Sequence, residues 1–182
     1  MEKGYEVLLF TDRVDNIWLQ DPPEYKNKRW ASVGCGSVEL GSEEERKTAD
    51  EELQSRTTDF SNLMSLFHEL LDKEIKEVRI TNRLTSSPAC LVSEVHDLPP
   101  QMIEVLRQVG RDVPNVKRIL ELNPKHPIMR KLLERFQHDE HDVIVRDYAE
   151  LIYGQAILAE GGQPSDPALF SKRLAEVMEQ GL

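Results

Sequence analysis

The chain has 182 residues, 39% of them hydrophobic, which suffices for one ordinary domain, or for a small domain with an appended fragment. Its 33 acidic and 23 basic residues give a formal net charge of -10, which argues against nucleic acid and anionic membrane lipid as partners. The only cysteines, Cys35 and Cys90, are too few for a secreted disulfide scaffold. Because the sequence also shows no signal peptide and no long apolar run, we expect a cytoplasmic protein.

The first predicted element is a short strand at residues 5–10, which is apolar on both faces and therefore typical of a strand covered on both sides. Asp12 then caps a short predicted helix that carries Trp18, and Pro22 ends this helix. A core strand so close to Met1 has nothing before it to cover it. We therefore expect that the chain begins at a cut end of a larger domain.

A charged stretch follows at residues 42–56, with few apolar positions and with acidic residues crowded at its start. This pattern predicts a solvated connecting helix or linker. We place the domain boundary here, so that residues 1–55 form the end of a sheet-containing domain with its connector. Residues 56–182 form the second domain.

The second domain is predicted to mix helices with a small three-stranded sheet, and the fold class is α+β. An amphipathic helix between Phe60 and Leu71 comes first, and a second helix at residues 98–109 lies between the last two strands. From His126 onward the spacing predicts helices only, the last of them capped by Asp166. The predicted strands are residues 77–82, 89–93 and 116–122.

Three sets of mainly apolar residues are candidates for contacts with other proteins. One stripe lies on the helix at 98–109; such a stripe usually packs in a core, yet its methionine is typical of adaptable binding surfaces. The last helix carries a stripe too narrow for a buried helix, which favours a seam with a second copy of the chain. The candidates are Leu98, Met102, Val105 and Leu106 on the first stripe, Phe170, Leu174, Val177 and Met178 on the last helix, and Ile144, Tyr148, Leu151, Ile152 and Gln155 on the helix before it.

Groups that could carry chemistry are few. The cluster His138–Asp142 contains two imidazoles and three carboxylates, but a full zinc ligand set at recognisable spacing is missing, and a charged helix start explains the cluster better. Ser86, Ser87 and Cys90 lack a nucleophile motif and an adjacent base, and the sequence contains no glycine-rich phosphate-binding loop. We therefore expect no catalytic residue and no bound metal. The alternative is a stand-alone metal-binding protein or enzyme that uses this cluster or Cys90.

Four segments resemble the 90-kilodalton heat-shock chaperone family of the bacterial type. EVLLFTDRVD with the following IWL resembles the end of the family's middle domain, and EVRITNRLTSSPACLV resembles its strand, R-L-T turn and next strand. RILELNPKHP resembles the family's E-x-N-P-x-H segment, and DPALFSKRLAEVMEQGL resembles its final dimerisation helix. These segments occur in register over nearly the whole chain, except at the linker around 41–56.

The resemblance implies an ATP-driven clamp of three domains that dimerises through its C-terminal domain and remodels client proteins. The family binds ATP and Mg in its N-terminal domain, so this chain is expected to hold no cofactor and no ATPase centre. Trp18 and the stripe from Leu98 to Leu106 match positions that face clients. The expected partners are a second copy of the chain and partly folded clients. The ending MEQGL differs from the acidic MEEVD tail that docks tetratricopeptide co-chaperones, so such docking is not expected.

Overall fold

The chain divides into two compact units, residues 1–46 with 93–116 and residues 47–92 with 117–182. Most of the described residues belong to the second unit. The computed structural model describes residues 8, 24, 26, 43–94, 97, 103, 106, 109–111 and 117–180, with secondary structure alone for 43–46 and 49.

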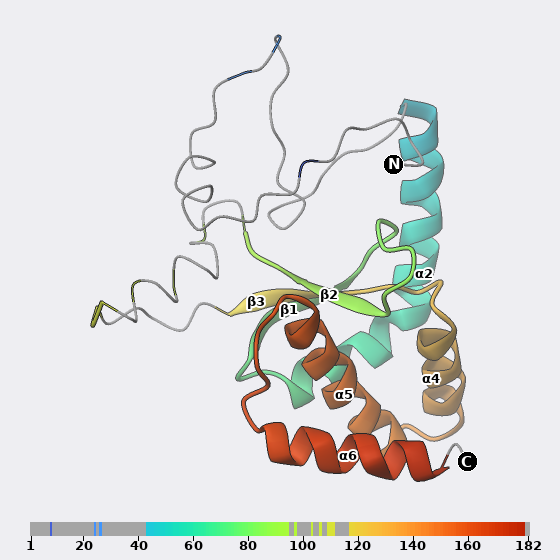
Figure 1. Cartoon of the computed structure of the whole chain (residues 1–182). Coiled ribbons are helices and arrows are strands. Elements are labelled where there is room, and N and C mark those ends of the chain that lie inside the picture. The colour runs from blue at the N-terminus through green and yellow to red at the C-terminus, as the bar shows by residue number, and fades with distance from the viewer. Residues whose placement is uncertain are drawn as a thin grey trace. The chain divides into compact units, whose positions relative to one another are not determined.

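A three-stranded mixed sheet lies in the second unit, as predicted (Figure 1). Its strands are β1 (Ile75–Ile80), β2 (Ala89–Val92) and β3 (Arg118–Leu122). The strand order is β1-β3-β2, and β3 runs parallel to β1 and antiparallel to β2. The predicted start of β1 at residue 77 is wrong by two positions, because polar, exposed residues with an irregular register near Ile75 hide the strand pattern.

Four helices with complete bounds accompany this sheet in the described part of the chain, which confirms the α+β class. None of the described helices combines the length and apolarity that a bilayer crossing requires. The four are α2 (Glu43–Leu70), α4 (Pro127–His138), α5 (Val143–Ala159) and α6 (Pro167–Gln180).

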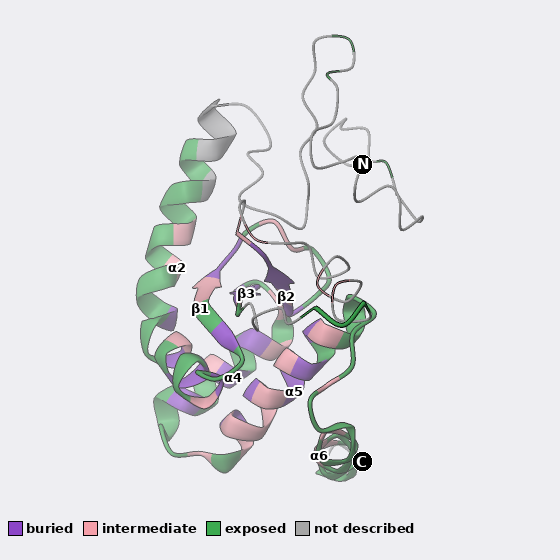
Figure 2. Cartoon of the chain, turned by 90° about the vertical axis from the view of Figure 1, so that its left-hand side faces the viewer, coloured by how far each residue is buried: buried purple, intermediate pink, exposed green. Residues whose placement is uncertain are grey.

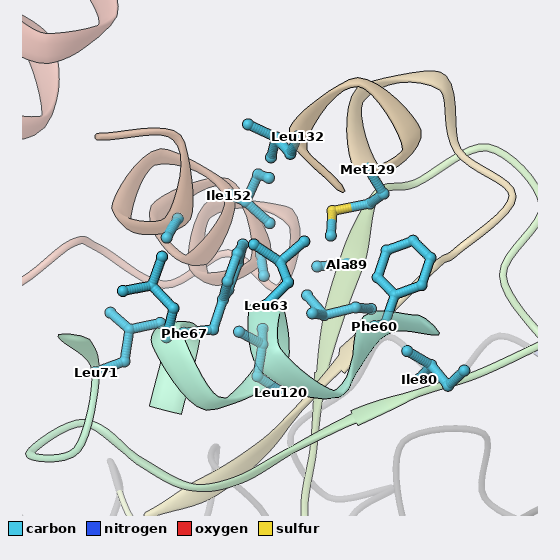
Figure 3. Packing of buried hydrophobic residues seen from close by; sticks show 14 of the residues in the cluster. Phe60, Leu63, Phe67, Leu71, Ile80, Ala89, Leu120, Met129, Leu132 and Ile152 are labelled. Atoms are coloured by element: carbon cyan, nitrogen blue, oxygen red, sulfur yellow. The ribbon is translucent and has the colours of Figure 1, made fainter. Parts of the chain in front are cut away.

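The core lies where α2, α4 and α5 meet one face of the sheet, and Figure 3 shows their apolar side chains converging there. Successive side chains of a strand point to opposite faces, so Leu120 and Leu122 of β3 enter this core while Glu121 between them does not. The described buried residues of α2 all lie in its C-terminal half, and half-buried Leu53 packs against the core from the N-terminal half. The core includes Phe60, Leu63, Phe67, Ile75, Leu91, Met129, Leu132, Val145 and Ile152.

Specific residues at the helix ends explain where the helices begin and stop. The Nδ1 atom of His126 accepts a hydrogen bond from the amide of Ile128 and caps α4, and Pro127 follows at the first helical position. Asp142 caps α5 in the same way. Gly161 follows α5 with a φ of 79°, a left-handed conformation that glycine adopts without strain. The predicted cap of α6 by Asp166 is confirmed by a 2.9 Å bond from the amide of Leu169 to Oδ1.

Several predicted elements lie wholly or largely outside the described residues. Of the predicted strand at 5–10 only Leu8 is described; it is half-exposed and lies in no element. The predicted helix from Asp12 lies outside. Of the predicted helix at 98–109, Ile103 and Leu106 are described and are helical, and Val109 is described and lies in a turn. The predicted boundary after residue 55 falls inside α2, which is continuous there, and it stays a prediction.

Candidate functional site

Two of the segments singled out in the sequence meet on the sheet face opposite the core. Glu121 of β3 is paired in register with Arg79 of β1 on one side and with Cys90 of β2 on the other. The Oε1 atom of Glu121 accepts hydrogen bonds from Nε and Nη2 of Arg79 at 2.9 and 2.7 Å. Its Oε2 atom accepts one from Nε of Arg83 at 2.5 Å. Glu121 is 4% exposed, and its carboxylate is shared by two guanidinium groups.

The thiol of Cys90 borders this charged cluster. Its Sγ atom lies 3.8 Å from Oε2 of Glu121 and 3.7 Å from Nη2 of Arg83. Burial raises the pKa of the Cys90 thiol, and the Glu121 carboxylate raises it further, while Arg83 opposes the rise. The thiol is thus kept protonated, which is the unreactive form, and the arrangement does not activate a nucleophile.

Asn123 organises the turn between β1 and β2. Its side chain is almost fully buried, and Nδ2 donates to the carbonyl oxygens of Leu84 at 3.3 Å and Ser87 at 3.0 Å. Its Oδ1 atom accepts the amide of Lys125 at 3.0 Å. One side chain thereby fixes the R-L-T turn to the start of the N-P-x-H segment. The cluster around Glu121 and Asn123 is a structural junction.

The predicted interface residues of α5 divide between the core and the surface. Ile152 is 3% exposed and belongs to the core, and Leu151 is 8% exposed. Ile144 and Tyr148 are half-buried, and Gln155 is exposed. A second copy could contact only the latter three without rearrangement of the chain.

The last helix, α6, has no buried residue anywhere along its length, and exposed green covers most of it in Figure 2. Leu174 is 42% exposed and Met178 is 62% exposed. These two residues are four positions apart and share one flank of the helix. Phe170 and Val177 are half-buried. The predicted seam is therefore split into an inner pair and an outer pair.

A polar and an apolar contact join α6 to α5. Nη1 and Nη2 of Arg173 donate to the two carboxylate oxygens of Glu150, the second at 3.1 Å, and Nε lies 3.4 Å from Oδ1 of Asp147. Phe170 packs directly on Gly154, where an added Cβ would lie 2.5 Å from Cδ2 of the ring. Phe170 was a predicted interface residue, but sequence reasoning missed Arg173 and Gly154 and the two acidic partners of Arg173. A glycine in the middle of a helical stripe is the signal that could have found the close approach.

The predicted client-facing residues are mostly outside the described part of the chain. Trp18, Leu98, Met102 and Val105 lie outside it, and Leu106 is half-buried in a helical turn. Their role stays a prediction.

The residues His138–Asp142 occupy the corner between α4 and α5. Oδ1 of Asp139 accepts the amide of His141 at 2.9 Å, and Asp142 both caps α5 and pairs with Arg135. Within the described residues, no three His, Cys, Asp or Glu side chains are grouped so that they could hold a metal ion. Two of the acidic residues in this cluster thus have structural roles.

A sequence model of the family described as Hsp90 protein matches residues 1–182. Chaperone protein HtpG of Frankia casuarinae is 41% identical over 180 residues, which is 99% of this chain and 28% of the relative. The HtpG chaperones of Nocardia farcinica and Mycobacterium tuberculosis are 42% and 43% identical, with the same coverage of both chains. The chain thus spans about 28% of the length of these curated relatives.

Proposed function

Since the chain belongs to the Hsp90 family, we propose that it is the dimerising and client-contacting C-terminal part of an ATP-dependent chaperone that assists protein folding under stress. The similar proteins are named as chaperones, and this supports the chaperone role. In this proposal the chain itself holds no ATP site and no cofactor, and the larger protein works in the cytoplasm.

The observation that carries the dimerisation proposal is the exposed apolar flank of α6. This helix contributes no buried residue to its own chain, yet it exposes Leu174 and Met178. An apolar flank on a helix that the core does not need is typical of a surface that a partner covers. A second copy is the proposed partner, because a two-fold axis lets the same flank cover itself.

The size of this flank limits the affinity. Fully burying a large apolar side chain contributes about 1.5–3 kcal/mol, so the exposed halves of Leu174 and Met178 on two subunits supply on the order of 3–6 kcal/mol before association costs. A micromolar dissociation constant needs about 8 kcal/mol. Further apolar surface must therefore take part. Leu158 of α5, 47% exposed, and Leu169 of α6, 41% exposed, are candidates.

Sedimentation equilibrium of the 182-residue chain tests dimerisation. We expect a dimer at tens of micromolar, and a folded monomer for Leu174→Glu, because a carboxylate in the seam would lose its hydration. Ala168→Glu introduces the same charge at an exposed position off this flank and should leave the dimer intact. A monomeric unmutated chain at this concentration would refute the dimerisation proposal.

The client-contacting role rests on the family resemblance of the stripe from Leu98 to Leu106. We expect Met102→Glu and Leu106→Glu to weaken the suppression of aggregation of a denatured client enzyme while the thermal midpoint stays within a few degrees. Gln108→Glu, which adds a charge nearby, serves as the control. If both stripe variants unfold, the stripe is core and does not face clients.

A metal-binding role for His138–Asp142 is the alternative function. Metal analysis of protein purified without chelator separates the two, because a structural zinc site keeps close to one metal per chain. Stoichiometric zinc that His138→Ala removes would favour the alternative.

A further inference from the structure

The orientation of α6 on α5 depends on very few side chains. Of the residues 167–180, none is buried, and those that are half-buried are Phe170, Arg173 and Val177. A helix held by so few residues is not fixed by packing alone, because a small rotation would cost it little buried surface. The contacts made by Arg173 and Phe170 therefore decide which flank of α6 faces outward.

The guanidinium group of Arg173 restricts the rotation of α6. It forms a two-pronged contact with the Glu150 carboxylate and a further ion pair with Asp147, one turn earlier on α5. A planar guanidinium that meets a carboxylate through two bonds fixes direction as well as distance. Arg173 is 22% exposed, so water screens these contacts only in part.

Gly154 restricts the distance and the position along the axis. The ring of Phe170 occupies the space in which any other residue at 154 would place its Cβ, at 2.5 and 2.6 Å from two ring carbons. The gap in the α5 surface accepts this ring only at one position along the helix. Arg173 thus restricts the rotation of α6, and Gly154 restricts its distance from α5 and its position along the helix axis.

We propose that Arg173 and Gly154 are positioning residues of the dimer surface: they lock α6 in the orientation that presents Leu174 and Met178 to a second copy. Arg173 and Leu174 are sequence neighbours, so their side chains diverge by about 100° around the helix. The inward ion pair of the first thereby aims the second outward. This inference rests on the proposed dimerisation and names what sets the geometry of the seam.

Two measurements on the 182-residue chain test the proposal. Sedimentation equilibrium at increasing salt reports the dimer, and hydrogen exchange of the α6 amides in the monomeric Leu174→Glu background reports the joint within one subunit. The test variants are Arg173→Glu, Gly154→Ala and the exchanged pair Glu150→Arg with Arg173→Glu. The matched controls are Lys172→Glu, which makes the same charge change at an exposed neighbour, and Gln137→Ala, at an exposed position of α4.

We expect Arg173→Glu and Gly154→Ala to raise the dissociation constant about tenfold or more and to speed exchange in α6. The exchanged pair should regain most of the affinity, and both controls should stay within about threefold. Equal weakening by Lys172→Glu, or no rescue by the exchanged pair, would overturn the positioning role. If the unmutated chain is a monomer, the proposed dimerisation is refuted. Independently, if Arg173→Glu leaves hydrogen exchange in α6 unchanged or slower, the proposed role of Arg173 in fixing α6 on α5 is refuted.

Discussion

At the scale of single residues, the junction between the R-L-T turn and the N-P-x-H segment depends on two buried polar side chains. Glu121 neutralises part of the charge of Arg79 and Arg83, and Asn123 uses its amide for three backbone bonds. Buried polar groups stabilise a fold only when all of their hydrogen-bonding partners are present. Substitutions here should therefore have large effects although neither residue is apolar.

Asn123→Ala should lower the free energy of unfolding by on the order of 2–4 kcal/mol, because it leaves buried carbonyl and amide groups without their partner. Urea denaturation followed by circular dichroism measures the change. Asn62→Ala removes the same group from an exposed position on α2 and should leave the midpoint unchanged or slightly raised. Equal midpoints for the Asn123 variant and the unmutated chain would contradict the role assigned to Asn123.

Glu121→Gln should lower the pKa of the Cys90 thiol. The carboxylate raises this pKa by disfavouring a second negative charge beside it, and the neutral amide leaves the positive charge of Arg83 unopposed. With Cys35 replaced by serine, the pH profile of the iodoacetamide reaction should therefore shift to lower pH, since the thiolate is the reactive form. Glu77→Gln on the exposed part of β1 is the control. An unshifted profile in folded protein would show that the Glu121 carboxylate does not raise the pKa of the thiol.

At the scale of elements, α2 combines two different kinds of helix. Among its described side chains before Phe60, only Leu53 and Arg56 are half-buried and the rest are exposed, whereas the segment from Phe60 to Leu70 packs into the core. An ion pair of Glu52 with Lys125 adds little, because both partners are about half exposed.

Hydrogen exchange should reflect this difference along α2. Amides before Phe60 should exchange much faster than those from Leu63 to Leu70, because local opening there exposes little buried surface. Mass spectrometry of overlapping peptic peptides resolves the two halves, with α5 as a protected reference. Uniform protection along α2 would indicate that something covers its first half in solution.

The sequence predicted the elements better than their mutual contacts. Apolar spacing predicted the helices after His126, and Asp166 marked the start of α6, because such a cap acts locally. The same spacing could not show that Phe170 packs against Gly154 while Leu174 stays outside, since periodicity defines a face but not its neighbour. Arg173 and Glu150 are 23 positions apart in the sequence, and Arg83 and Glu121 are 38 positions apart. Patterns in a single sequence do not connect residues at such separations.

At the scale of the whole molecule, the chain is a part-length match to its relatives, and its proposed activity belongs to a larger assembly. The family resemblance supports the proposed dimerisation and client contacts of the exposed apolar residues, which composition alone does not predict. The residues that carry the resemblance, Glu121, Asn123 and His126, each have a contact that explains their type.

The 182-residue chain should not bind ATP. Its sequence contains no glycine-rich phosphate-binding loop, and its net charge of -10 disfavours a polyphosphate. Isothermal titration calorimetry with Mg-ATP should show no heat of binding at tens of micromolar protein. A micromolar affinity would show that a nucleotide site had been overlooked.

The strand order β1-β3-β2 has a consequence for the folding of this chain during its synthesis on the ribosome. The middle strand is made last, so the two strands synthesised before it have no neighbour to bond until residue 122 has emerged. The 25 residues between Val92 and Arg118 take about 1–5 s to make at typical bacterial and eukaryotic rates. During that delay the edges of β1 and β2 and the arginine partners of Glu121 are unpaired, so they can pair with other segments or other chains. A protein proposed to assist the folding of other chains would therefore pass through an aggregation-prone state during its own synthesis.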